Sequence, residues 1–215
     1  MPQTAFAHVN EWVFDLDNTL YPPAMRLFDQ IEEKMRGYMV ENLGIDHAEA
    51  NHLRKHYWEV HGTTLAGLMR EHGIEPDPFL TAVHDISFDV LQPDPDLASL
   101  IKNLPGRCIV YTNGTRPYAE QVLAARGLSG LFDAIYGIEH ANYLPKPERG
   151  AFDLEFGADG LNHENAAMFE DEVRNLEVPH AMGLLTVHVA PENAGKEYVH
   201  FHTDDLTSFL RQISG

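Results

Sequence analysis

Two aspartates follow a short apolar run near the start of the chain, in the stretch WVFDLD at residues 12–17. An apolar run that ends in acidic side chains is typical of a buried strand of a parallel sheet, whose carboxyl edge is where ligands bind. Asp15 and Asp17 are two residues apart, so both side chains leave extended backbone on the same face. Two anions this close repel each other unless a cation lies between them, so a divalent metal is expected. With a phosphate ester bound there, one carboxylate could attack phosphorus while the other transfers the proton of the leaving group.

Polar groups follow three other predicted strands, each at the point where the apolar run stops. These are the TNG turn at 112–114, Lys146 between two prolines, and the pair Glu170 and Asp171. A hydroxyl and turn amides suit phosphate oxygens, a lysine supplies a point charge, and a carboxylate completes a hard-metal site. Taken singly, each has an ordinary explanation as a turn, a solvated loop lysine or a helix cap. All four in this order and strand context favour a single site at one sheet edge.

Hydrophobic periodicity divides the chain into an all-helical part and an alternating part. Residues 21–92 are predicted to hold helices only, over about 27–43, 46–61, 63–73 and 76–91. From residue 93 onward strands alternate with helices, with strands predicted at 108–112, 134–136, 166–169, 184–189 and 198–202. This alternation predicts an α/β fold with a doubly wound parallel sheet. The expected domains are a catalytic core of residues 1–20 and 93–215 and a helical cap of residues 21–92, inserted where it can cover the end of the first strand.

The composition excludes several classes of partner. The 215 residues are 44% hydrophobic, enough for a real core, and the net charge of −18 argues against binding to nucleic acid polymers or anionic membranes. No apolar run approaches the length of a membrane span, and residues 1–10 do not look like a targeting signal, so a soluble cytoplasmic protein is expected. The only cysteine, Cys108, is expected to be a buried thiol. The oligomeric state is left open.

The motifs DLDNT, TNG, PKP and EDEVRN together resemble the four motifs of the haloacid dehalogenase-like (HAD) phosphohydrolase superfamily, in the order and approximate spacing of that family. The resemblance spans the chain and implies a Rossmann-like core with a C1-type cap. It also implies that Asp15 is the nucleophile, which forms an aspartyl-phosphate, and that Asp17 is the general acid and then the general base. By the same resemblance Thr112 and the amide of Asn113 hold the phosphate, and Lys146 steadies both Asp15 and the phosphate.

The resemblance further implies Mg²⁺ as cofactor. Its ligands would be Asp15, the carbonyl of Asp17, and Asp171, while Glu170 would act through metal-bound water. True haloacid dehalogenases need no metal and lack an acid two residues after the nucleophile. The presence of Asp17 therefore makes the chain resemble the phosphatases of the superfamily.

Longer phrases, among them DNTLYPP, HGTTLAGL and YGIEHANYLPKP, resemble the pyrimidine 5'-nucleotidase group. This resemblance implies that the partner is a small phosphorylated metabolite, a pyrimidine nucleoside 5'-monophosphate. In the cap, Thr63 and Thr64 are expected to contact the leaving group, because Gly62 permits close approach and two hydroxyls can pair with base or ribose. The alternative is that one of these threonines caps the third helix.

Other functions stay open at this point: a phosphatase for phosphoglycolate or a sugar phosphate, a phosphomutase, or a binding module without enzymatic activity. The last is disfavoured, since a scaffold gains nothing from clustering carboxylates at a sheet edge.

Overall fold

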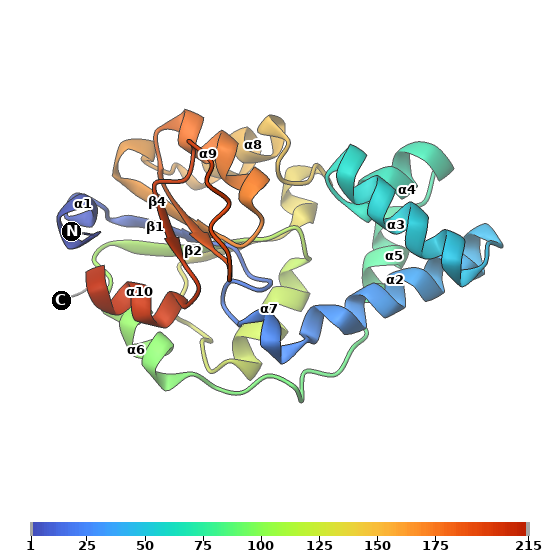
Figure 1. Cartoon of the computed structure of the whole chain (residues 1–215), viewed down its shortest axis with the longest axis horizontal. Coiled ribbons are helices and arrows are strands. Elements are labelled where there is room, and N and C mark those ends of the chain that lie inside the picture. The colour runs from blue at the N-terminus through green and yellow to red at the C-terminus, as the bar shows by residue number, and fades with distance from the viewer. Residues whose placement is uncertain (1, 214–215) are drawn as a thin grey trace.

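The structure, a computed structural model, describes residues 2–213. Its centre is a six-stranded sheet with the strand order β3-β2-β1-β4-β5-β6, in which every neighbouring pair is parallel (Figure 1). The strands are β1 (Glu11–Phe14), β2 (Arg107–Tyr111), β3 (Ala134–Tyr136), β4 (Ala166–Glu170), β5 (Leu185–Val189) and β6 (Phe201–Thr203). The predicted doubly wound parallel sheet is therefore confirmed, although β6 begins later than expected.

Helices cover both faces of this sheet. Those packed on one face are α1 (Pro2–Phe6), α6 (Pro95–Lys102), α7 (Arg116–Ala125) and α10 (Leu206–Ile213), and those on the other are α8 (Arg149–Asp159) and α9 (Glu177–Met182). Short 3-10 helices occur at Pro23–Met25, Ile138–Ala141, His163–Asn165 and Val173–Leu176. Helix α1 was not predicted. None of the described helices is long and apolar enough to cross a membrane.

The central strand β1 is buried on both sides. Trp12 and Phe14 point into the larger apolar cluster, and Val13 points into the second cluster on the opposite face. Successive side chains of a strand alternate between faces, so a strand that lies between two helical layers must be apolar at every position. This explains why the apolar run before Asp15 is uninterrupted.

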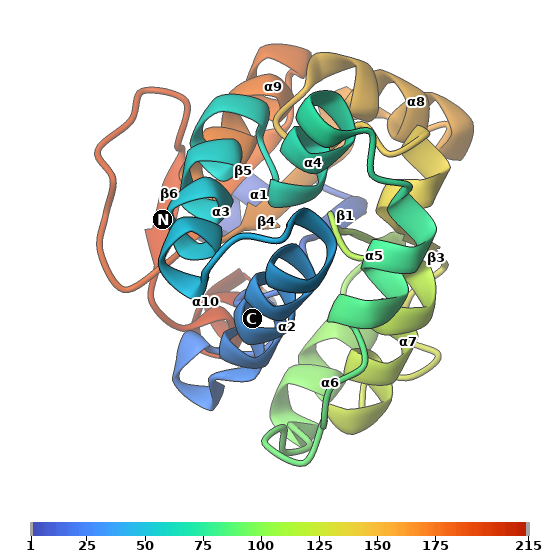
Figure 2. The same ribbon diagram turned by 90° about the vertical axis from the view of Figure 1, so that its right-hand side faces the viewer.

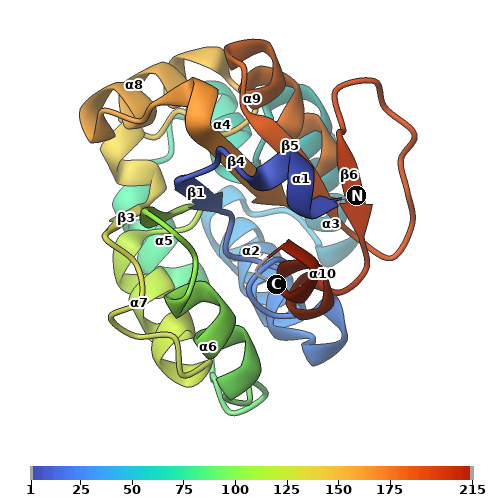
Figure 3. The ribbon, with the colours of Figure 1, turned by 90° about the vertical axis from the view of Figure 1, so that its left-hand side faces the viewer.

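All four long helices of the inserted segment lie beyond the carboxyl ends of the strands, as Figure 2 shows from that side. They are α2 (Leu27–Leu43), α3 (His47–His61), α4 (Thr64–His72) and α5 (Pro76–Val83). Gly44 ends α2 in the left-handed conformation, with φ of 67°, and the carboxylate of Asp46 caps α3 by accepting from the amide of Glu49. Helices α1 and α10 lie at the opposite end of the molecule (Figure 3).

The predicted fourth helix of the insertion, 76–91, is wrong beyond Val83. After α5 the chain is held by a side chain instead: the amide of Ser87 donates to Oε1 of Gln30 at 3.1 Å, and Nε2 of Gln30 donates to the carbonyl of Ser87 at 2.9 Å. Side-chain hydrogen bonds of this kind replace those that a helix would make within its own backbone.

Arg126 joins the two segments that connect the insertion to the sheet. This buried guanidinium donates to the carbonyl of Leu20 (3.1 Å) on the outgoing segment, and to the carbonyl of Gln92 and the carboxylate of Asp94 (3.0 Å) on the returning segment. The base of the insertion is thus fastened at both crossings by one side chain.

Candidate active site

The carboxyl ends of the adjacent strands β2, β1 and β4 bring three of the predicted motifs together, and the segment after β3 brings Lys146 to them. Strand β1 lies between β2 and β4, and the chain crosses from one side of β1 to the other after β3. The amide of Asp15 donates to the carbonyl of Phe169 at 2.9 Å, which fixes the end of β1 against that of β4. Strand order reverses at this point, and such reversals are where open α/β sheets bind ligands.

Lys146 is the positive centre of the site. Its side chain is 1% exposed, and Nζ donates to Oδ1 of Asp15 (2.7 Å), Oε2 of Glu170 (2.6 Å) and the carbonyl of Tyr111 (3.0 Å). Burial lowers the pKa of this lysine, but the adjacent carboxylates of Asp15 and Glu170 outweigh it, so the net pKa is raised and the side chain is cationic.

Asn113 holds the loop that carries this lysine. Its Oδ1 accepts from the amide of Lys146 at 2.8 Å, and its Nδ2 donates to the carbonyl of Lys146 at 3.2 Å. The side chain of Asn113 is therefore a clamp on the loop, so that only its backbone amide is suited to the predicted phosphate contact.

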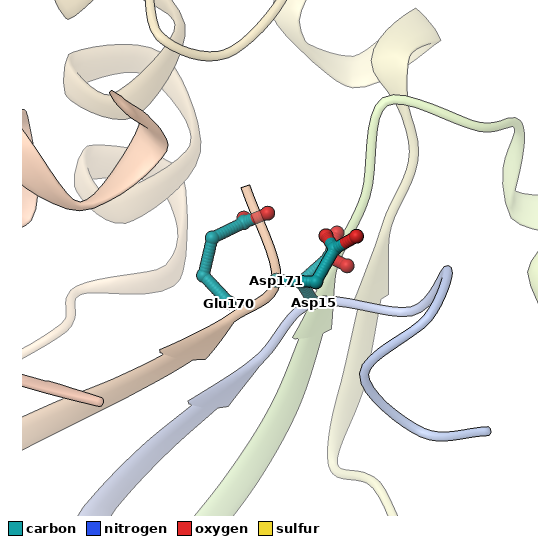
Figure 4. Close-up of side chains that lie close together, drawn as sticks. All are labelled: Asp15, Glu170 and Asp171. Atoms are coloured by element: carbon teal, nitrogen blue, oxygen red, sulfur yellow. The ribbon is translucent and has the colours of Figure 1, made fainter. Parts of the chain in front are cut away.

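Asp15, Glu170 and Asp171 form an acidic cluster in which one carboxylate oxygen of each lies within 4.8 Å of the others (Figure 4). Burial and then the charge of Glu170 raise the pKa of Asp15 to about 7, although Lys146 opposes the change. Burial and then Asp15 raise the pKa of Asp171 well above its ordinary value. When all three carboxylates are ionised, the single charge of Lys146 does not balance them, and their hard oxygen donors fit a divalent cation.

Within this cluster the three carboxylates are not equivalent. Besides Lys146, the side chain of Glu170 accepts from the amide of Glu172 (3.2 Å) and from Nδ2 of Asn175 (3.1 Å), so both of its oxygens are engaged. Asp171 accepts from Nδ2 of Asn18 at 3.2 Å. The predicted indirect role of Glu170 stays a prediction, and its hydrogen bonds are compatible with it.

The carboxylate of Asp17 lies outside the acidic cluster. Its Oδ1 accepts from the hydroxyls of Tyr21 and Tyr118, both at 2.6 Å. Burial and then the charge of Asp15 raise the pKa of Asp17 to about 6, despite these two hydrogen bonds, which lower it. Neither tyrosine was singled out from the sequence, because Tyr118 occupies a core position of an amphipathic helix and Tyr21 follows the turn after Asp17.

Thr112 is 1% exposed and directly follows β2, beside these groups. Its Oγ1 accepts from the amide of Gly114 at 2.9 Å. An accepting hydroxyl keeps its own hydrogen free, so Thr112 is oriented to donate to an oxygen of a ligand.

A cavity of about 520 Å³ extends from this strand edge into the inserted helices. Asp15, Asp17, Thr112 and Lys146 line its inner end. The inserted segment contributes the apolar side chains of Phe28, Ile31, Met35, Leu65, Phe79, Leu80 and Val83. Polar lining groups that the sequence did not single out are Glu32, Arg54, Lys55, Glu59 and His84 of the insertion, and Glu172 and Arg174 beside the sheet edge.

Thr63 and Thr64 also line the cavity, but both hydroxyls have partners within the protein. Oγ1 of Thr63 accepts from the amide of Ala66 at 3.1 Å and caps α4, and Oγ1 of Thr64 donates to the carbonyl of Arg54 at 3.2 Å. The capping alternative is thereby confirmed for Thr63. Contact of either threonine with a leaving group stays a prediction.

Arg174 ties the insertion to the sheet edge. Its guanidinium lies 3.9 Å from the ring centroid of Trp58 and donates to the carbonyls of Trp58 (2.8 Å) and Gly62 (3.0 Å). Gly62 has φ of 87°, and a Cβ there would come within 3.3 Å of the carbonyl of Lys146. The turn after α3 can approach the lysine loop this closely only because it carries glycine.

These features place the chain among α/β proteins that bind ligands at the carboxyl edge of a parallel sheet. The family model described as haloacid dehalogenase-like hydrolase matches residues 12–183, and the chain belongs to this hydrolase family.

Individual relatives agree with this assignment. Phosphate metabolism protein 8 of Saccharomyces cerevisiae is 26% identical over 190 residues, which cover 80% of this chain and 58% of the yeast protein, so the chain spans little more than half the length of that relative. Among solved structures, CbbY from Rhodobacter sphaeroides in complex with phosphate has a TM-score of 0.65 at 18% identity, covering 94% of this chain and 99% of that one. A HAD phosphatase from Thermococcus onnurineus has a TM-score of 0.64 at 16% identity, covering 96% and 98%. L-2-haloacid dehalogenases share this fold as well. At such identities the structural likeness shows the fold alone.

Proposed function

We propose that the chain is a Mg²⁺-dependent phosphohydrolase that cleaves a small phosphomonoester through an aspartyl-phosphate on Asp15. The observation that carries this proposal is the separation of two aspartates with different partners. Asp15 is bound by Lys146 within the acidic cluster, whereas Asp17 is held apart from it by two tyrosine hydroxyls. A nucleophile and a separate acid are what hydrolysis of a phosphate ester requires, and a dehalogenase has no use for the second group.

In the first step an oxygen of Asp15 attacks phosphorus, and the bond from phosphorus to the ester oxygen breaks. Lys146 binds Oδ1 of Asp15, which leaves Oδ2 to attack. Asp17, whose pKa of about 6 keeps a fraction protonated near neutral pH, gives its proton to the departing oxygen. The hydroxyl of Thr112, the amide of Asn113 and the charge of Lys146 stabilise the phosphoryl oxygens as negative charge spreads over them.

In the second step a water molecule attacks the phosphorus of the aspartyl-phosphate. Asp17, now a carboxylate, takes a proton from this water, the bond from phosphorus to Asp15 breaks, and inorganic phosphate leaves. Both starting protonation states are restored, so the residues complete a cycle.

The proposed ligands of Mg²⁺ are Asp15, Asp171 and the backbone carbonyl of Asp17, with Glu170 behind them. When bound, the ion supplies positive charge that reduces repulsion between the phosphate and the carboxylates. The raised pKa values of Asp15 and Asp171 support this assignment, because they show a buried group of anions that Lys146 alone does not balance.

For the substrate we propose a pyrimidine nucleoside 5'-monophosphate, with segment 21–92 acting as the cap that encloses it. A cavity of about 520 Å³ is in the usual range for small-molecule sites. Apolar walls from Phe28, Met35 and Phe79 suit the faces of a heterocyclic base. The hydroxyls of a bare sugar phosphate would be left unpaired against the same walls, which costs free energy.

A panel of phosphate esters tests both the proposed phosphohydrolase activity and the proposed specificity for pyrimidine nucleotides. Phosphate release would be measured from UMP, CMP, GMP, ribose 5-phosphate, phosphoglycolate and p-nitrophenyl phosphate, with Mg²⁺ and with a chelator, using Asp15→Asn protein as the blank. We expect Mg²⁺-dependent release, fastest from UMP and CMP. Equal rates for UMP and GMP would contradict the nucleotide assignment and indicate a general phosphatase. Isomerisation of a sugar phosphate without phosphate release would indicate a mutase, and inertness toward every ester would contradict the enzyme.

A further inference from the structure

An ion pair between α2 and α3 forms one polar part of the cavity wall, which Lys55, Glu59 and His84 also line. Nη1 of Arg54 lies 2.9 Å from Oε1 of Glu32, and both residues line the cavity. The side chain of Arg54 is 11% exposed and that of Glu32 is 34% exposed. Burying the charge of an arginine costs free energy unless the charge is paired, and Glu32 supplies that pair.

Glu32 does not use all the donors of this arginine. Nε of Arg54 is buried and has no hydrogen-bond partner among residues 2–213. Unpaired buried donors are rare, and a donor on a charged group costs more than a neutral one. The backbone of Arg54 is fixed as well, because its carbonyl accepts from the hydroxyl of Thr64. Arg54 is therefore fixed at the cavity wall, and because Nε is enclosed, its Nη groups, of which Nη1 pairs with Glu32, are the donors proposed to meet a ligand.

The surroundings restrict what this ion pair can bind. Phe28, Met35 and Phe79 supply apolar surface to the same cavity, whereas Lys55, Glu59 and His84 add further polar groups, so a ligand there needs apolar faces as well as a polar edge. A carboxylate beside a guanidinium offers an acceptor next to donors, which complements a ring N–H next to a carbonyl oxygen.

We propose that Glu32 and Arg54 recognise the base of the substrate, with Arg54 donating to a carbonyl oxygen and Glu32 accepting from the adjacent ring N–H, as uracil provides. This inference rests on the proposed nucleotide phosphatase and names the residues that select its leaving group. The competing role is structural, in which the ion pair only joins α2 to α3.

Two substitutions separate these roles. Arg54→Met removes the charge and every donor, whereas Arg54→Lys keeps a cation for Glu32 but loses the planar fork with its second donor. A structural ion pair would be restored by lysine, and base recognition would not. Arg36→Met is the matched control, since Arg36 pairs with Glu33 within α2 and does not line the cavity.

The substrates to compare are UMP and ribose 5-phosphate, which share the phosphate and the ribose and differ in the base. We expect both Arg54 variants to lower kcat/KM for UMP by about 10- to 100-fold, the effect of one hydrogen bond from a charged donor. The value for ribose 5-phosphate should change less than about threefold, and Arg36→Met should change neither. Calorimetric titration with uridine adds a readout that does not depend on hydrolysis, and Arg54→Met should abolish that binding.

The outcomes distinguish the two proposals. Equal loss for both substrates, or full recovery in Arg54→Lys, overturns base recognition while leaving the phosphatase intact. Base recognition is also overturned, with the phosphatase intact, if the wild-type protein cleaves ribose 5-phosphate as efficiently as UMP. Uridine binding that requires Arg54 in a protein that hydrolyses neither ester overturns the phosphatase and keeps the base site. Absence of both hydrolysis and uridine binding overturns both.

Discussion

The hydroxyl of Tyr118 donates a 2.6 Å hydrogen bond to Oδ1 of Asp17, across 101 residues of chain. Tyr21 donates to the same oxygen at the same distance, and both tyrosines are 1% exposed. Burial raises the pKa of both phenols well above their ordinary value, so they act as neutral donors. With Oδ1 occupied twice, Oδ2 is the oxygen of Asp17 that remains to exchange a proton with substrate or water.

Loss of the Tyr118 hydroxyl should therefore impair proton transfer. We expect Tyr118→Phe to lower kcat for UMP by about 10-fold, roughly the value of one buried hydrogen bond. With p-nitrophenyl phosphate the loss should be smaller, because its leaving group departs without a proton. The hydrogen bond lowers the pKa of Asp17, so its removal should move the alkaline limb of the kcat profile to higher pH.

Tyr136→Phe is a matched control for this experiment, because its hydroxyl donates to Asp159 at 2.9 Å, outside the cavity lining. A loss of equal size with both substrates, or an unmoved pH profile, would show that Tyr118 only packs.

Asp15→Asn should abolish turnover while leaving the protein folded. The amide is a poor nucleophile and a weaker ligand for a hard cation, and it is nearly the same size as the carboxylate it replaces. Phosphate release and the circular dichroism melting curve would be measured on the same sample. Substantial turnover in a folded Asp15→Asn protein would assign the nucleophile elsewhere.

The acidic cluster should make the stability of the metal-free protein depend on pH. The pKa of Asp15 is raised to about 7 and that of Asp171 is also raised well above its ordinary value, so above about pH 4 the folded state holds protons that the unfolded chain has released. This contribution to stability is present at low pH and is lost as the pH rises through about 7. Added Mg²⁺ should consequently raise Tm more at pH 8 than at pH 5.5.

The carboxylate variants give the control for this measurement. Asp171→Asn should reduce the Mg²⁺-dependent rise in Tm, whereas Asp85→Asn, on an exposed side chain, should leave it unchanged. A second group also makes stability depend on pH: burial lowers the pKa of His84 to about 4, so stability is lost as the pH falls below about 6.5. The quantity to compare is therefore the difference in Tm with and without Mg²⁺ at each pH. An undiminished Mg²⁺ effect in Asp171→Asn would place the metal elsewhere.

Arg126→Met should destabilise the protein by about 3 kcal/mol, because it leaves the carbonyls of Leu20 and Gln92 without their donor. Urea unfolding would measure the free energy. Arg211→Met, which breaks an exposed pair with Asp96, should cost less than about 1 kcal/mol. Similar losses of unfolding free energy in the two variants would contradict the conclusion that Arg126 fastens the base of the insertion.

The local parts of this molecule could be predicted from the sequence. Gly44 marks the end of α2 and Asp46 marks the start of α3, as expected, since caps depend on a few adjacent residues. The meeting of Asp15, Lys146 and Asp171 at one edge also followed, because parallel strands present their carboxyl ends on the same side. The end of α5 at Val83 did not follow, since it depends on Gln30, which is 57 residues away from Ser87 along the chain.

Only the tertiary structure decided which side chains complete the site. The sequence identified Asp17 by its spacing from Asp15, but Tyr118 reaches it only because α7 packs into the same apolar cluster as the side chains of Trp12 and Phe14. Likewise the sequence analysis did not single out Arg54 or Glu32, whose pairing arises because α2 packs against α3 at the cavity. Periodicity records which face of an element is apolar, whereas the partner of a single polar group depends on how distant elements pack, and that arrangement has no local signature.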